Sequence, residues 1–116
     1  MAQATPTDPA LRTPTVLAVL VTHDAAGWIR GCLQALAAQT YPRLGVLAVD
    51  NASTDETREI LEQSLGSGRV LALEDNLGVA GAVQAALASV PAATAADYLL
   101  ITHDDTAMDP DCVTRL

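Results

Sequence analysis

Four short runs of apolar residues recur along the chain, and polar residues follow each of them. The runs cover residues 16–21, 44–49, 70–73 and 98–102. Each has the length of a β-strand, and an unbroken apolar run is typical of a strand that is buried on both faces. Because such strands occur mainly in parallel sheets, the pattern predicts a parallel sheet of about four strands.

Apolar residues at helical spacing separate these runs. The first set covers about residues 28–39, and Ser53 and Glu56 then form a capping-box pattern at the start of a second helix. The third set has the clearest periodicity, and Pro91 is expected to end it. Its members are Val79, Ala82, Val83, Ala86, Leu87 and Val90.

Strands and helices therefore alternate, which is the order of an α/β fold with right-handed crossovers. We expect a Rossmann-like parallel sheet with flanking helices over residues 15–116. Residues 1–14 contain several prolines and are expected to form a flexible leader. Asp109 and Pro110 have the residue types of a helix start, and only six residues follow. This unfinished helix indicates a domain that is truncated at its C-terminal end.

The charge composition excludes several functions. The chain has no lysine, and six arginines stand against 14 carboxylates, for a net charge of −8. This rules out a P-loop lysine and a Schiff-base lysine, and it leaves too little positive charge for a nucleic-acid surface. The acidity fits either solubility or a site that holds a divalent cation.

The two cysteines and the hydropathy bear on the chain's location. Cys32 and Cys112 have no metal-binding spacing and are expected to be ordinary thiols, Cys32 a buried one. No run of 18 apolar residues exists to span a membrane, and the N-terminus lacks the apolar region of a secretory signal. The chain is therefore expected to be cytoplasmic, and membrane association of a full-length protein stays open.

Residues whose side chains can bind ligands gather at the ends of the predicted strands. In open parallel sheets, ligands bind beyond the carboxyl ends of the strands. Turn chemistry explains any one of these ends, but four polar ends at one sheet edge favour a binding site. The segments are Thr22-His23-Asp24, Asp50 to Asp55, Glu74 to Gly78, and His103-Asp104-Asp105.

The segment His103-Asp104-Asp105 is the most specific of the four. Adjacent carboxylates repel each other unless a cation or strong hydrogen bonds compensate. Mg²⁺ accepts one or two carboxylates together with phosphate oxygens and water. A metal site is therefore favoured over two carboxylates that only cap a turn. A single histidine at a strand end, such as His23 or His103, is more often a hydrogen-bonded structural group.

In their order and spacing, these motifs resemble family 2 glycosyltransferases over about residues 15–116. The resemblance implies the nucleotide-binding half of a GT-A fold. It also implies sugar transfer from a nucleotide-diphosphate donor to an unknown glycan, lipid or protein acceptor, with Mg²⁺ or Mn²⁺ as the cofactor. The motifs are the first strand with His23-Asp24, Asp50 to Thr57, Asn76-x-Gly78, the fourth strand with Asp104-Asp105, and Met108 to Asp111.

The resemblance assigns residues to a donor site. The turn Thr22-His23-Asp24 matches the family's turn that lies against the nucleotide base and ribose. Asp50 and Asn51 match an acidic pair whose second member, usually Asp, contacts uracil. Because Asn51 stands at that second position, the expected base contact is altered. Ser53, Asn76 and Gly78 complete the nucleotide-sugar-binding set.

The metal site is implied in the same way. Asp104 matches the carboxylate that meets the ribose, and Asp105 matches the last residue of the Asp-x-Asp motif that holds the metal. His103 stands where the first Asp of that motif is usual, and it is the second candidate metal ligand. Inverting members place a catalytic base in the second half of the domain, so a base is expected beyond Leu116.

Two other classes of function stay open. A non-catalytic doubly wound module, similar to a receiver domain, would bind a metal or a partner and would use Asp50 as a phosphoacceptor. The absence of lysine counts against it. A dinucleotide-dependent oxidoreductase would need Gly-x-Gly-x-x-Gly after the first strand, and residues 22–27 lack it. Gly78 and Gly81 open the third helix, whose N–H groups favour a phosphate.

Overall fold

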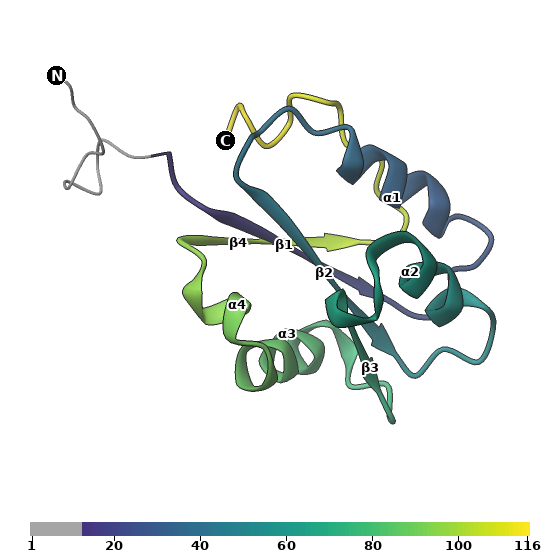
Figure 1. The fold of residues 1–116 in the computed structure, drawn as a ribbon. Helices are drawn as coiled ribbons and strands as arrows, with labels where there is room; N and C mark the ends of the chain where they lie inside the picture. The colour runs from purple at the N-terminus through teal and green to yellow at the C-terminus, as the bar shows by residue number, and fades with distance from the viewer. Residues whose placement is uncertain (1–12) are drawn as a thin grey trace, which may run out of the picture.

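The computed structural model describes residues 13–116. Within this range, a four-stranded sheet has the order β3-β2-β1-β4, and every pair of neighbouring strands is parallel (Figure 1). This topology confirms the predicted α/β class with a Rossmann-like parallel sheet. The strands are β1 (Val16–Thr22), β2 (Leu44–Asn51), β3 (Val70–Leu73) and β4 (Tyr98–His103).

Helices cover both faces of the sheet, which gives three layers (Figure 1). Such cover is needed because the strands are apolar on both sides. A short 3₁₀ helix, η2 (Ser67–Arg69), leads into β3. One face carries α1 (Ile29–Ala37) and α2 (Thr57–Leu65), and the other carries α3 (Gly78–Ser89) and α4 (Pro91–Ala95).

Two apolar clusters fill the space between the sheet and the helices. Alternate residues of β1 point to opposite clusters, so Leu20 packs with α1 and α2 while Val19 packs with α3 and α4. Ala82 and Ala86 are the buried residues of α3, and their small side chains let this helix lie close to the sheet. The chain has no phenylalanine, and aliphatic side chains build its core.

The apolar stripe predicted on α3 is only partly buried. Ala82 and Ala86 lie in the core, but 41% of Val79 and 38% of Leu87 are exposed. The two alanines occupy the line of closest approach to the sheet, so side chains at the margins of the stripe point toward solvent. The predicted helix is correct, and its predicted buried face is too wide.

Two prolines act differently from expectation. Pro91 ends α3, but it also begins α4 at a first-turn position, where its missing N–H is not needed. The helix expected from Pro110 does not form, because residues 110–115 make successive turns with mixed three- and four-residue hydrogen bonds.

The predicted flexible leader, residues 1–14, lies mostly outside the described residues, which begin at Thr13. Thr13 and Pro14 are bonded to the segment before β2. The Arg43 guanidinium donates to the Thr13 carbonyl at 2.7 Å, and the Tyr41 hydroxyl donates to the Pro14 carbonyl. Within residues 13–116, no helix has the length and apolar character needed to cross a membrane.

Candidate functional site

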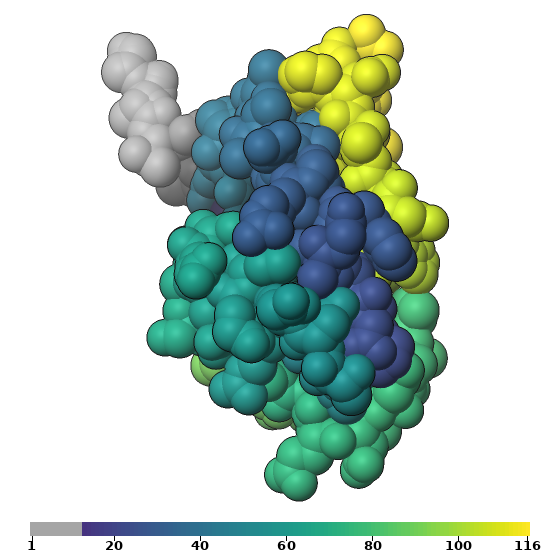
Figure 2. All heavy atoms as spheres, turned by 90° about the vertical axis from the view of Figure 1, so that its right-hand side faces the viewer, coloured from purple at the N-terminus to yellow at the C-terminus, as the bar shows by residue number. Residues whose placement is uncertain are grey.

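The strand order changes direction at β1, because β2 lies on one side of it and β4 on the other. Ligands of open α/β sheets bind at such a switch point, beyond the carboxyl ends of the strands. The register brings these ends level, with Thr22 opposite Asp50 and Val21 opposite His103. Figure 2 views the molecule from this side, where segments that follow β1 (purple-blue), β2 (teal) and β4 (yellow) share one surface.

A hollow of about 200 Å³ lies at this edge of the sheet, between the ends of β1, β2 and β4 and the start of α3. Asp24, Asp50 and Ser53 do not line it but form a hydrogen-bonded cluster of their own, and Asp105 also lies outside the lining. Seven residues singled out from the sequence line the hollow: Thr22, His23, Asn51, Asn76, Gly78, His103 and Asp104.

Asp104 joins the end of β4 to the loop after β1. The Thr22 hydroxyl donates to Asp104 Oδ2 at 2.9 Å, and the Trp28 indole N–H donates to Oδ1 at 3.0 Å. The backbone N–H of His23 also donates to Oδ2, at 3.4 Å. Donors on both oxygens fix the orientation of this carboxylate at the switch point.

The contact of Trp28 is a feature that sequence reasoning missed. Helical spacing assigned Trp28 to the apolar face of the first helix, whereas the side chain is 52% exposed and bonded to Asp104. The available signal was the indole itself, because a tryptophan placed on a buried helix face usually needs a hydrogen-bond partner for its N–H. Only the fold identifies that partner, which lies 76 residues away in the chain.

His23 and Asp24 make a tight loop directly after β1. His23 Nδ1 lies 2.6 Å from the Asn51 carbonyl oxygen, and His23 Nε2 lies 3.2 Å from Asp24 Oδ2. Asp24 has φ +48°, a left-handed conformation in which Asp is enriched. Its Oδ1 accepts the backbone N–H of Thr54 at 2.6 Å. His23 therefore has the structural role typical of a single histidine, and its side chain also lines the hollow.

Asp50 and Ser53 form the inner part of this loop cluster. Asp50 is only 2% exposed, and the Ser53 hydroxyl donates to its Oδ1. The same Ser53 oxygen accepts the backbone N–H of Asp24 at 2.9 Å. A phosphoacceptor must be accessible to its phosphate donor, so the burial of Asp50 counts against the receiver-like alternative.

The start of α2 differs from the predicted capping box. The Thr57 N–H donates to Asp55 Oδ1 at 2.9 Å, and the Ala26 N–H donates to Asp55 Oδ2 at 3.1 Å. Ser53 is not the cap, because its hydroxyl is bonded to Asp50 and the helix begins only at Thr57. The capping-box prediction is therefore wrong: Glu56 is the N-cap residue and makes no side-chain cap bond, and Asp55, the residue before it, accepts the Thr57 N–H.

These contacts hold Asp55 in its ionised form. Hydrogen bonds, that of the Thr57 hydroxyl above all, lower the pKa of Asp55 below its ordinary value of 3.8. The stability that this gives is present above the pKa of the unfolded chain and is lost as the pH falls through the lowered pKa. Acid is therefore expected to loosen the link between α2 and the loop after β1.

The predicted metal ligands, His103 and Asp105, lie at the end of β4. Both are exposed, and the Thr106 N–H closes the turn between them by donating to the His103 carbonyl at 3.2 Å. Within residues 13–116, no group of three or more His, Cys, Asp or Glu side chains is arranged to hold a metal ion. One carboxylate and one imidazole fit only an ion that takes its other ligands from phosphate oxygens and water.

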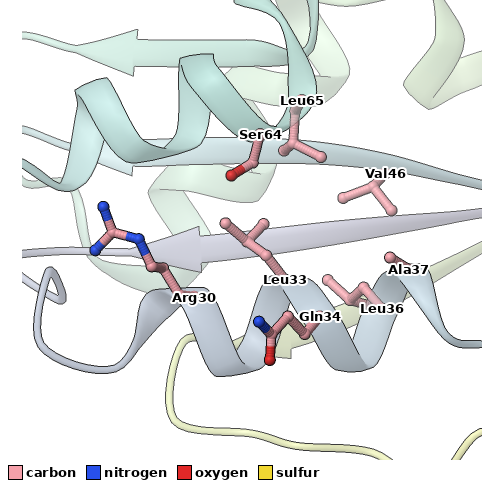
Figure 3. Close-up of a pocket in the computed structure, with 8 residues that line it drawn as sticks. All are labelled: Arg30, Leu33, Gln34, Leu36, Ala37, Val46, Ser64 and Leu65. Atoms are coloured by element: carbon pink, nitrogen blue, oxygen red, sulfur yellow. The ribbon is translucent and has the colours of Figure 1, made fainter.

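Two of the three larger hollows in the described part of the chain lie away from the polar strand ends. One, of about 400 Å³, lies between α1 and α2 and has mainly aliphatic walls, with Arg30, Gln34 and Ser64 among them (Figure 3). The other, of about 520 Å³, lies at the opposite end of the sheet beside Tyr41 and Tyr98. The third, of about 350 Å³, has Glu56 and Glu59 from the start of α2 in its walls but no residue of a strand end. The smaller hollow at the switch point gathers polar side chains from three strand ends, so it is the candidate site on its chemistry.

Cys32 lies next to the site, and its environment makes it unreactive. The side chain is 3% exposed, and its Sγ lies 3.5 Å from the His103 carbonyl oxygen. Burial, followed by the negative charges of Asp104 and Asp105, raises the pKa of the Cys32 thiol to about 11. Because the thiolate is the reactive form, we expect DTNB at about pH 8 to label the half-buried Cys112 and not Cys32 in the folded chain.

The labelling prediction has a direct control. Cys112→Ser should show no labelling in the folded state and one reactive thiol after denaturation. Two thiols of similar reactivity in the folded wild-type chain would contradict the described burial of Cys32.

Comparison with known proteins agrees with this geometry. The family model described as glycosyl transferase family 2 matches residues 18–116. The chain belongs to glycosyl transferase family 2. This membership confirms the resemblance that the strand-end motifs carry. A search of curated proteins gave no match.

Solved structures of S. aureus TarS share the fold of this family 2 chain. TarS 1–349 superposes with a TM-score of 0.72 at 24% identity, over 87% of this chain and 30% of that one. TarS 1–349 in complex with UDP-GlcNAc gives a TM-score of 0.66 at 24% identity, over 87% of this chain and 29% of that one. The chain therefore spans less than a third of the TarS 1–349 structures, and 18% of a further TarS structure.

Proposed function

We propose that this chain is the donor-binding portion of a family 2 glycosyltransferase, which transfers a sugar from a nucleotide-diphosphate donor with the help of a divalent metal. The observation that carries the proposal is the convergence of polar residues from three strand ends and the start of α3 on one hollow at the switch point. Structures of TarS, which share this fold, include complexes with UDP and with UDP-GlcNAc, and this supports the same class of donor. The acceptor stays open among glycans, lipids and proteins.

The residues around the hollow suit the parts of such a donor. Asp104, oriented by Thr22 and Trp28, would accept hydrogen bonds from ribose hydroxyls. Gly78 and Val79 bring the N-terminal end of α3 to the hollow, and the partial positive charge of a helix N-terminus favours a diphosphate. The chain has no lysine for this charge.

Asp105 would hold Mg²⁺ or Mn²⁺, with His103 as the second candidate ligand. A carboxylate suits these hard ions better than an imidazole does, so Asp105 is the main ligand of the two. A bound ion would stabilise the negative charge of the departing diphosphate as a Lewis acid. Because the chain supplies so few ligands, the metal and the diphosphate are expected to bind together.

A calorimetric titration tests this proposal. UDP, CDP, GDP and ADP are each titrated into the chain with Mn²⁺, with Mg²⁺ and with EDTA. We expect at least one diphosphate to bind, and its affinity to fall about tenfold or more in EDTA, because the ion neutralises phosphate charge that the protein does not. Mn²⁺ without nucleotide should bind weakly, since two side chains do not complete its coordination.

The matching nucleoside monophosphate is the control, because it lacks the second phosphate with which a metal bridges the two partners. Its binding should depend much less on the metal. A sample that unfolds cooperatively, and is therefore folded, but binds no diphosphate in a metal-dependent way would overturn the proposal.

A further inference from the structure

The side chain of Asn51 uses both of its polar ends on the start of α3. Asn51 lies at the end of β2 and is 2% exposed. Its Oδ1 accepts the Leu77 N–H at 3.1 Å, and its Nδ2 donates to the Gly78 carbonyl at 3.1 Å. We call this pair of hydrogen bonds the Asn51 bracket. An ionised aspartate could not make it, because a carboxylate only accepts and would place an oxygen against the Gly78 carbonyl.

The turn held by the Asn51 bracket is constrained in two further ways. Gly78 has φ +73°, which favours glycine, and the Asn76 Oδ1 accepts its N–H at 3.0 Å. Gly81 allows Leu77 to fold closely over the helix, since a Cβ at Gly81 would lie 2.6 Å from the Leu77 Cβ. These features point to one required position for this turn.

The same turn forms one wall of the hollow at the switch point. Gly78 and Val79 line the hollow from α3, and Asn51 lines it from β2. The main-chain carbonyl of Asn51 also accepts a hydrogen bond from the His23 ring in the loop after β1. Asn51 is therefore bonded to two sides of the hollow, and its position determines how far apart they lie.

We infer that Asn51 is a positioning residue that holds the first turn of α3 against β2, and that its side chain does not select the nucleobase. Both ends of this amide already have a partner inside the protein, and the 2% exposure of Asn51 leaves its second N–H and its second oxygen lone pair little access to a nucleobase. The Asn at the position where an acidic residue was expected therefore holds the first turn of α3 in place. The nucleobase part of this inference rests on the proposed function, and the Asn51 bracket does not.

Amide hydrogen exchange tests the bracket without any ligand. In Asn51→Asp, the amides of residues 77–81 should exchange about tenfold faster near neutral pH, because the Gly78 carbonyl loses its Asn51 donor and the turn is held less firmly. Amides of α1 should keep their rates. Gln84→Glu adds the same charge at an exposed position of α3 and serves as the matched control. Unchanged exchange at residues 77–81 in Asn51→Asp would overturn the inference.

Nucleotide titrations test whether Asn51 selects the base. With Mn²⁺ present, the affinities of UDP, CDP, GDP and ADP should all fall by a similar factor in Asn51→Asp, about tenfold, so that their order is kept. A changed order would show that Asn51 reads the base and would overturn that part of the inference. If no diphosphate binds the wild-type chain, the proposed function fails, and the exchange experiment still decides on the bracket.

Protonation provides a signature that a general loss of stability would not give. The carboxyl introduced by Asn51→Asp can donate to a carbonyl only when it is protonated, and burial favours that form. The ratio of the exchange rates of residues 77–81 in Asn51→Asp to those in wild type should therefore fall between about pH 8 and about pH 5.5. The titratable groups that face this position, Asp50, His23, His103 and Asp104, are present in both chains, so the wild type measured at each pH is the reference. A ratio that rises in acid would contradict the explanation that the variant lacks a donor to the Gly78 carbonyl.

A second variant perturbs the same turn from its other side. Gly81→Ala forces the Leu77 side chain away and should also speed exchange at residues 77–81. Gly31→Ala is its control, since a Cβ at that position of α1 meets no atom within 4 Å. If Gly81→Ala leaves these amides and the nucleotide affinity unchanged, the turn does not need the position that the bracket gives it, and the inference fails.

Discussion

Asp105→Asn is expected to remove the metal-dependent part of nucleoside diphosphate binding. Asp105 is the exposed carboxylate at the end of β4, and within residues 13–116 no cluster of three or more ligating side chains could replace it. Loss of a group that only supports a metal ligand costs up to about a hundredfold in affinity, so loss of the main ligand should cost at least that. Titration of UDP with Mn²⁺ and with EDTA measures the effect, and the two curves should coincide in the variant.

Asp109→Asn is the matched control for this experiment. It removes the same charge from another exposed carboxylate four residues farther along the chain. Metal-dependent binding in Asp109→Asn should equal that of the wild type, because this side chain lies beyond the turn that follows β4. An Asp105→Asn variant that keeps full Mn²⁺ dependence would show that the ion is held elsewhere.

The sheet could be predicted from the sequence because its signal is local. An apolar run such as residues 16–21 has strand length and no polar break, and parallel packing is what makes both of its faces apolar. The elements that were missed or wrong depend on weaker signals. Helix α4 has five residues, too few for a periodic pattern, and the turns after Pro110 share the residue types of a helix start.

The candidate site was predictable in its place but not in its contacts. Parallel strands bring their carboxyl ends to one edge, so polar residues after the runs had to gather there. Which of them bond to each other depends on side chains that are far apart in the chain. Trp28 donates a hydrogen bond to Asp104, which lies 76 residues away in the chain, and Leu77 donates one to Asn51, 26 residues away. No local sequence pattern shows whether the Asn51 side chain bonds to the start of α3 or binds a ligand.

Thr57→Val is expected to destabilise the fold by about 1–3 kcal/mol, the usual cost of leaving a buried polar group without a partner. Thr57 is fully buried, and its Oγ1 accepts the N–H of the equally buried Ala25 at 2.8 Å while its hydroxyl donates to Asp55. Valine keeps the shape of threonine and removes only the hydroxyl. Urea unfolding at neutral pH measures the loss. Thr54→Val removes an exposed hydroxyl that donates to Asp24 at 3.3 Å, and it should change stability by less than about 0.5 kcal/mol, because water can replace that bond.

The pH dependence of this loss separates its two causes. The Thr57 hydroxyl is the largest contributor to the lowered pKa of Asp55, so its removal should raise that pKa toward the ordinary value of 3.8. Stability from the Asp55 carboxylate is present above that value and is lost as the pH falls through the lowered pKa. The difference between wild type and Thr57→Val should therefore be largest at neutral pH and smaller in acid, where only the unpaired Ala25 N–H contributes. A difference that stays constant down to acid pH would mean that Asp55 gains nothing from Thr57, and that the hydroxyl matters only as the partner of Ala25.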